Sequence, residues 1–383
     1  MIYFDNAATT YPKPRSVPCA VYASFRRYGA NPGRAGHDLS LATAEQVYFC
    51  RKALAEMFGA PDADHVVFTL NCTYALNMAI KGLISPGDHV VTSELEHNAV
   101  MRPLEELRRR GKITYTRARV HIGNPAATVA EFERAIRPET RLIVCTHVSN
   151  VFGVILPVEQ IGALAARRGL CFVVDCAQSA GVLPVDLKRL RADCLCMPGH
   201  KGLYGPMGTG VLICSGARPM RTIIEGGTGS LSKSLDQPDL LPDRFEGGTI
   251  NVPGIVGLRA GAAFVRATGA EVIRRHEEAV AGEIYAGLSE MKGIKLYTPA
   301  PRAGVIAPVL SFNVDGLGSE QTAALLNEAG IAVRAGLHCA PCAHRAFHTL
   351  ETGTVRVSPG AFNTQRDAAR LIKSVFQIAK SRK

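Results

Sequence analysis

A chain of 383 residues exceeds the size at which one hydrophobic core normally stops growing, so we expect two domains. Hydrophobic residues make up 47% and charged residues 20% of the composition, which is typical of a packed globular protein. The formal net charge is +11, but the basic residues are spread along the chain, aromatic residues are 6% and tryptophan is absent. We therefore expect no nucleic-acid partner, and attribute the charge to an acidic partner or a phosphorylated ligand.

Apolar strands alternate with helices through the first two thirds of the chain. After an N-terminal segment, 1–14, the pattern predicts strands at 66–69, 89–92, 142–145 and 171–174, and helices at 39–58, 71–80, 101–110 and 157–168. Each strand is a continuous apolar run, as expected for strands buried on both faces of a mainly parallel sheet. We predict a large three-layer α/β domain over 15–256, whose ligand lies at the carboxyl ends of the strands.

Polar side chains follow three of these strands, in the segments 93–98, 146–150 and 175–179. Any one of them could be a helix cap or a satisfied buried polar group. Three such polar segments at the same edge of a sheet together indicate a functional site. The amides that begin the helix at 71–80 add a place for a phosphate, although such strand-to-helix turns are common.

The segment 196–210 contains five glycines, two prolines and, near its middle, Lys201. We expect a shaped loop here, because glycine and proline at this density interrupt helices and strands. Its lysine could bind phosphate, form a covalent imine, or simply face solvent. No Walker loop, dinucleotide fingerprint or zincin motif is present, so nucleotide and hydride chemistry are not expected.

The last third of the chain changes character and predicts a smaller α+β domain over 257–383. A long helix at 257–288, with a break near 267–269, precedes strands at 309–314, 331–334 and 354–358 and helices at 319–329 and 364–379.

Eleven cysteines without an export signal are better explained as reduced thiols than as disulfides, so we expect a cytoplasmic protein. No window approaches eighteen consecutive apolar residues, and no membrane association is expected.

An aspartate that ends a buried strand, Asp175, precedes Lys201 by 26 residues, a combination that suits pyridoxal 5′-phosphate. The lysine would form an imine with the cofactor aldehyde, and the aspartate would keep the pyridine nitrogen protonated. With these residues in place, the chain resembles the class V aminotransferase family of fold-type-I pyridoxal phosphate enzymes, in its cysteine desulfurase and selenocysteine lyase branch. The motifs that carry the resemblance span nearly the whole chain: Tyr3 to Thr10, Glu96-His97-Asn98, Ser149-Asn150-Val151, Asp175 to Ser179, Gly199-His200-Lys201, Arg334 to Pro341, and Gly360 to Thr364.

The resemblance implies a role for each matching cofactor residue. Lys201 would hold the cofactor and shuttle the Cα proton, Asp175 would pair with the pyridine nitrogen, and His97 would stack on the ring. Gln178 and Asn150 would bond the phenolate oxygen or the substrate carboxylate. No metal site is expected, because the single residue between Cys342 and His344 does not match the ligand spacing of a zinc finger.

Further residues match the family's phosphate and carboxylate contacts. Thr73 and His200 would bind the phosphate, and Thr249 would reach the phosphate of a partner subunit, which implies a homodimer with shared sites. Arg356 would clamp the substrate carboxylate bidentately. The chain departs from many relatives at Pro198, where a serine or threonine would supply a further hydroxyl to the phosphate.

Cys339 matches the family nucleophile, which implies that its thiolate takes a persulfide from L-cysteine and leaves L-alanine. L-Selenocysteine is the alternative substrate, and an aminotransferase or epimerase is the alternative class V activity. Cys339 and Cys342 could instead form a redox pair, or bind metal with His344 and His348. The non-enzymatic alternative is a thiol or metal-binding scaffold that delivers sulfur to an acidic acceptor protein.

Overall fold

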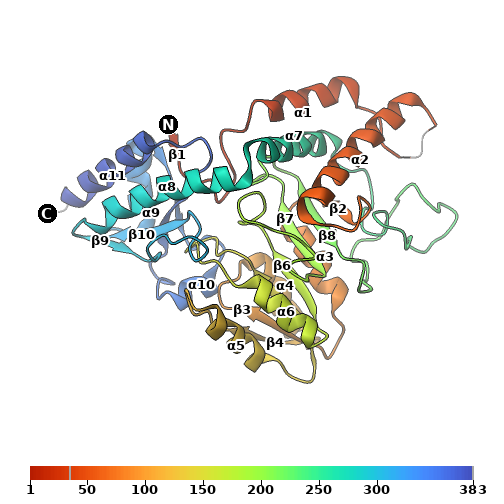
Figure 1. Ribbon diagram of the computed structural model, residues 1–383, viewed down its shortest axis with the longest axis horizontal. Coiled ribbons are helices and arrows are strands. Elements are labelled where there is room, and N and C mark those ends of the chain that lie inside the picture. The colour runs from red at the N-terminus through yellow and green to blue at the C-terminus, as the bar shows by residue number, and fades with distance from the viewer. Residues whose placement is uncertain (34–35, 382–383) are drawn as a thin grey trace.

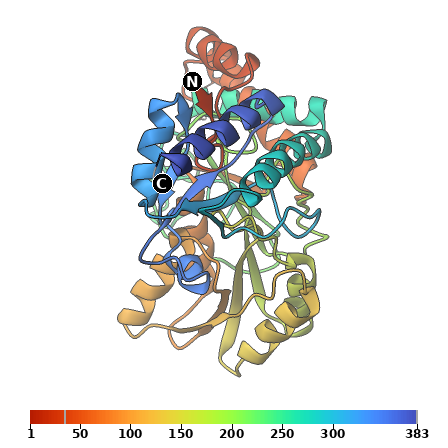
Figure 2. The same ribbon diagram turned by 90° about the vertical axis from the view of Figure 1, so that its left-hand side faces the viewer.

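The computed structural model describes residues 1–33 and 36–381, which form two parts built on separate sheets (Figures 1 and 2). Residues 34–35 of the predicted large domain and 382–383 of the predicted C-terminal domain lie outside this description.

The larger part contains a seven-stranded sheet in the order β2-β8-β7-β6-β5-β3-β4. Strand β8 runs antiparallel to β2 and β7, and every other neighbouring pair is parallel, which confirms the predicted mainly parallel sheet. The strands are β2 (Val66–Thr69), β3 (His89–Ser93), β4 (Thr114–Ala118), β5 (Thr140–Thr146), β6 (Cys171–Asp175), β7 (Cys194–Pro198) and β8 (Gly210–Cys214).

Helices cover both faces of this sheet and confirm the three-layer prediction. Side chains of β6 show why its run is continuously apolar: Phe172 and Val174 pack into one core, and Val173 packs into the other. The first face carries α2 (Asp38–Phe58), α5 (Pro125–Ala135), α6 (Val158–Arg167) and α7 (Val252–Thr268), and the second carries α3 (Cys72–Leu83) and α4 (Asn98–Arg109).

Several elements differ from the sequence-based predictions. The predicted loop at 196–210 is wrong at both ends, because the buried residues Cys196 to Pro198 complete β7 and Gly210 begins β8. Proline is tolerated as the last residue of β7, where it pairs with Gly210. Helix α1 (Ser16–Arg27), which packs along α7, contains Pro18 in its first turn, where the missing amide costs no helical hydrogen bond. β4 and α5 were not predicted.

The smaller part is an antiparallel sheet in the order β12-β13-β10-β9, with α8, α9 and α11 packed on it (Figure 2). Its elements are α8 (Ala270–Ser289), β9 (Ile294–Leu296), β10 (Leu310–Val314), α9 (Ser319–Glu328), β12 (Arg334–Gly336), β13 (Thr354–Val357) and α11 (Gln365–Lys380). The predicted helix break is confirmed at Gly269, which separates α7 from α8.

The strand predicted at 331–334 is divided between two sheets. Its first half, β11 (Ile331–Ala332), pairs in parallel with β1 (Ile2–Tyr3), while its end enters β12. The N-terminus therefore belongs to the smaller part by packing, with Phe4 buried in its core. The boundaries predicted for the domains remain predictions.

Candidate functional site

A cavity of about 240 Å³ lies at the carboxyl ends of β5, β6 and β7 and extends to the smaller part. It is lined by residues from at least six separate segments of the chain, as the predicted edge-of-sheet site requires. The predicted site residues that it brings together are Thr73, His97, Asn150, Asp175, Gln178, His200, Lys201, Cys339 and Arg356.

Lys201 enters the cavity from the connection 199–209 between β7 and β8, which we call the Lys201 turn. Backbone hydrogen bonds from Gly199 to Thr209 (2.9 Å) and from Gly205 to Gly199 (2.8 Å) shape that turn. Burial lowers the pKa of Lys201, and the nearby Cys72 and Asp175 only partly oppose this effect. The lysine amine is therefore easier to deprotonate than an exposed one, as covalent chemistry at nitrogen requires.

Asp175 ends β6, and its Oδ1 accepts a hydrogen bond from the Ala177 amide at 2.9 Å. Burial raises the pKa of this carboxyl group. A protonated pyridine nitrogen beside it would supply the positive charge that stabilises a buried carboxylate.

The start of helix α3 forms the wall that suits a phosphate. Asn71 caps this helix by accepting from the Tyr74 amide at 3.1 Å, so Thr73 lies in a first turn whose amides have no helical acceptors. His200 Nδ1 is buried without a hydrogen-bond partner among the described residues. These groups fit the phosphate of pyridoxal phosphate, and Pro198 lines the same cavity without a hydroxyl group.

His97 caps helix α4, where its Nδ1 accepts from the Ala99 amide at 3.0 Å. Burial first, and then the charge on Lys201, lower the pKa of His97 to about 4. The ring is therefore neutral at physiological pH, with its proton on Nε2, and its face is suited to stack on an aromatic cofactor. Gln178 donates through Nε2 to the Ala7 carbonyl at 2.9 Å.

Arg356 lies on β13 with its side chain only 3% exposed. Its Nη2 donates to Asp5 Oδ1 at 2.5 Å and its Nη1 to the Asn150 carbonyl at 3.0 Å. Nε is buried and has no partner among the described residues. Asp5 was not singled out individually in the sequence, although it lies within the motif at 3–10.

Two further contacts to the Lys201 turn were missed, because they join segments almost two hundred residues apart. The His200 carbonyl accepts from Lys13 Nζ at 2.7 Å and from the Thr10 amide at 3.1 Å. Burial lowers the pKa of Lys13 to about 8. No local pattern in the sequence marks these residues as partners of the turn.

Cys339 lies between β12 and the short helix α10 (Pro341–Ala346), exposed at the cavity mouth. Its backbone φ is 57° and that of His338 is 47°, so two consecutive non-glycine residues are left-handed. Asn98 N donates to the Cys339 carbonyl at 2.7 Å, and Asn150 Nδ2 to the His338 carbonyl at 2.8 Å. The loop that carries Cys339 is therefore held by two parts of the cavity wall, the start of α4 at Asn98 and the segment after β5 at Asn150.

The residues considered as metal ligands, all within the described part of the chain, do not form a metal-binding group, although His348 lines the same hollow as Cys342. His344 is buried, and its Nδ1 lies 2.8 Å from Thr349 Oγ1. Across residues 1–33 and 36–381, no group of three or more His, Cys, Asp or Glu side chains is arranged to hold a metal ion.

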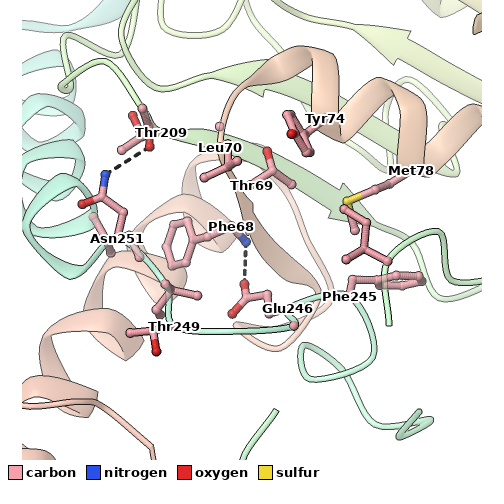
Figure 3. Close-up of a pocket in the computed structure, with 16 residues that line it drawn as sticks. Phe68, Thr69, Leu70, Tyr74, Met78, Thr209, Phe245, Glu246, Thr249 and Asn251 are labelled. Atoms are coloured by element: carbon pink, nitrogen blue, oxygen red, sulfur yellow. Dashed lines mark hydrogen bonds between the residues drawn. The ribbon is translucent and has the colours of Figure 1, made fainter. Parts of the chain in front are cut away.

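Thr249 does not line the Lys201 cavity. It lines another hollow, of about 430 Å³, with Phe68, Leu70 and Tyr74 (Figure 3). Glu246 anchors the Thr249 segment to β2 by accepting from the Phe68 amide at 2.5 Å. Leu70 is 55% and Tyr74 42% exposed, so this hollow opens on an apolar part of the surface.

None of the helices in the described residues is both long enough and apolar enough to cross a membrane.

Comparisons with known proteins agree on one family. The family model described as aminotransferase class-V matches residues 2–371. A probable cysteine desulfurase of Methanothermobacter thermautotrophicus is 36% identical over 99% of this chain and 94% of its own length. One of Pyrococcus abyssi is 34% identical over 100% of this chain and 95% of its own length. The apo structure of a cysteine desulfurase from Thermococcus onnurineus is 33% identical, covers 99% of this chain and 95% of its own, and superposes with a TM-score of 0.90. A cysteine desulfurase of Escherichia coli is 26% identical over 99% of this chain and 94% of its own, with a TM-score of 0.87.

Proposed function

The chain belongs to the class-V aminotransferase family, and from this premise we propose that it is a pyridoxal phosphate-dependent cysteine desulfurase that converts L-cysteine to L-alanine. The observation that carries the proposal is that Cys339, Lys201 and Arg356 line one cavity. A lysine and an aspartate alone would equally suit an aminotransferase or an epimerase. A thiol at the mouth of the same cavity gives sulfur transfer a nucleophile.

Bound pyridoxal phosphate supplies an electron sink for negative charge that develops at the substrate Cα. Thr73, His200 and the first amides of α3 would hold its phosphate, and Asp175 its pyridine nitrogen. His97 would cover one face of the ring. Lys201 Nζ would hold the cofactor at rest and carry the Cα proton when free, a role that its lowered pKa supports.

Arg356 would bind the substrate carboxylate through its free Nε and one terminal nitrogen, while Asp5 and Asn150 fix the plane of the guanidinium group. The thiolate of Cys339 would then attack the substrate sulfur. The bond between that sulfur and the substrate Cβ would break, its electron pair would stay on the carbon fragment that is released as alanine, and the sulfur would remain on Cys339 as a persulfide. The left-handed backbone at 338–339 supports this assignment, because strained conformations concentrate at functional loops.

We place the active enzyme in a homodimer. The support is the position of Thr249, which lies outside its own chain's Lys201 cavity on a partly apolar surface, where a partner's phosphate could reach it. All eleven cysteines are free, and seven of them are buried, which supports a reducing compartment such as the cytoplasm. The surplus of basic residues supports an acidic sulfur-acceptor protein as partner.

Alanine and sulfide formation from L-cysteine, with dithiothreitol as reductant, tests the activity. We expect Cys339→Ala to abolish it and Cys19→Ser, a change at another exposed thiol, to leave it intact. Full activity in Cys339→Ala contradicts the persulfide mechanism, and a wild-type enzyme without alanine formation contradicts the proposed activity.

L-Selenocysteine, assayed in parallel, decides which chalcogen the enzyme prefers. The enzyme would be a selenocysteine lyase instead if kcat/KM is higher for L-selenocysteine than for L-cysteine and if Cys339→Ala retains the activity with L-selenocysteine.

A further inference from the structure

A separate hollow of about 510 Å³ lies beside the Cys339 loop and shares no lining residue with the Lys201 cavity. It is formed by the segment after β3, by β4 and the residues after it, and by α10. Its charged and reactive lining residues are Glu94, Arg117, Arg119, Cys342, Arg345 and His348.

The three arginines of this hollow lack the carboxylate partners that some other surface arginines have. Arg108, Arg110 and Arg168, for example, each pair with a glutamate within 2.7 Å. Within the described part of the chain, none of the three arginines that line the hollow has a carboxylate partner. The one acid among them, Glu94, uses its Oε1 to accept from the Val120 amide at 2.8 Å. The hollow therefore has an excess of positive charge, three arginines against one glutamate, and none of these arginines forms an ion pair within the described residues.

The thiol of Cys342 lies among the arginines that line this hollow. Arg117 Nη1 donates a hydrogen bond to Cys342 Sγ at 3.1 Å, so the sulfur is in direct contact with one of the three arginines. Cys342 follows Cys339 by three residues, at the start of α10, and is partly buried. The loop between them thus has one thiol at the Lys201 cavity and another in the basic hollow.

We propose that the basic hollow binds a small, doubly charged sulfur acceptor of the sulfite class, and that Cys342 relays sulfur to it from Cys339. The proposal rests on the proposed desulfurase activity. In the first step the Cys342 thiolate attacks the outer sulfur of the Cys339 persulfide. The old S–S bond breaks, and Cys339 leaves as a thiolate.

In the second step the lone pair of the sulfite sulfur attacks the outer sulfur, which now resides on Cys342. Thiosulfate forms, and the electron pair of the broken bond returns to Cys342 as a thiolate. The sulfite sulfur is oxidised and the transferred sulfur reduced, so no other oxidant or reductant is needed. Because this step joins an anion to a dianion, charge repulsion opposes it unless cations surround the reactants. Arg117, Arg119 and Arg345 supply that positive charge.

The test measures alanine and thiosulfate from L-cysteine with the holoenzyme, using sulfite as the acceptor and dithiothreitol in parallel. We expect thiosulfate to form in step with alanine and to saturate with sulfite. Cys342→Ser and Arg345→Met should each lower thiosulfate formation about tenfold. Alanine formation with dithiothreitol should stay within about twofold of the wild type, as is usual for changes outside an active site.

Arg366→Met is the matched control, because it removes an equal charge from an exposed position on α11. It should leave the sulfite dependence unchanged. The relay is wrong if Cys342→Ser forms thiosulfate at the wild-type rate, and the anion site is wrong if Arg345→Met responds to sulfite as Arg366→Met does. A wild-type enzyme that forms no alanine with dithiothreitol overturns the proposed function, and the relay with it.

Discussion

Replacement of Arg356 by lysine tests how the cavity recognises a carboxylate. The guanidinium group divides its donors between Asp5 (2.5 Å) and the Asn150 carbonyl (3.0 Å), and leaves Nε free. Lysine retains the charge, but its donors all lie on one atom, so it cannot keep both protein contacts and also bind a carboxylate in a fork. Loss of one hydrogen bond to a charged group costs about 1.5–3 kcal/mol. That range corresponds to a fall in kcat/KM of about 10- to 160-fold.

Initial rates of alanine formation over a range of L-cysteine concentrations provide the assay. We expect the fall in kcat/KM to come mainly from a higher KM. Arg334→Lys is the control, since Arg334 lines the same cavity but is 47% exposed and lies 4.0 Å from Asp5. It should change kcat/KM by less than about threefold, in keeping with the small energies of exposed ion pairs. The carboxylate assignment is refuted if Arg356→Lys has the wild-type KM, or if the two variants lose activity equally.

Four further predictions follow from single contacts. Lys201→Ala should abolish both alanine formation and the visible absorbance of the lysine-bound cofactor, whereas Cys339→Ala should lose only the former; absorbance spectra of the two variants check this. Lys13→Met removes a charge-assisted donor to the Lys201 turn and should speed cofactor dissociation by about tenfold or more, with recovery in Lys13→Arg, measured by dilution and loss of absorbance. Thr249→Val should lower the cofactor content that remains after gel filtration, and unchanged content would contradict a phosphate contact. The pKa of buried Glu277 is raised to about 8, so its contribution to stability is present below about pH 4.5 and lost as pH rises through about 8. Glu277→Gln should therefore flatten the fall in the unfolding temperature between pH 6 and 8.5, measured by circular dichroism.

The elements that the sequence predicts well are those whose apolar pattern has a single explanation. The run at 171–174 is a central strand, and the run at 66–69 is an edge strand whose side chains are nevertheless buried. Strand β4, at the other edge of the sheet, was missed because it is largely polar, with Thr114 and Arg117 exposed. A strand without a run of buried apolar side chains lacks the hydrophobic signal on which such predictions depend.

The candidate site was predictable where a motif follows a strand directly. Asp175 belongs to this class, since it directly follows the predicted strand at 171–174. Lys201 was singled out by its glycine- and proline-rich segment instead, because the strand that precedes it, β7, was not predicted. Pairings between distant segments were not predictable. Asp5 meets Arg356 across 351 residues, and the contact depends on β1 lying beside β11, a two-residue pairing without a sequence signal of its own.

The N-terminal segment links the two halves of the proposed mechanism. Phe4 exchanges backbone hydrogen bonds with Ala332 and Ser358, on the side of the cavity that carries Arg356 and leads to Cys339. A few residues later, Thr10 and Lys13 hold the carbonyl that precedes Lys201. These contacts fix the carboxylate-binding group and the lysine turn relative to each other through one short stretch of chain. Correct spacing between them is required if one substrate is to reach Arg356, Lys201 and Cys339 together, because an error of about 1 Å can cost a hundredfold in rate. In the proposed mechanism we therefore expect the segment to contribute by positioning, although it provides no group that reacts.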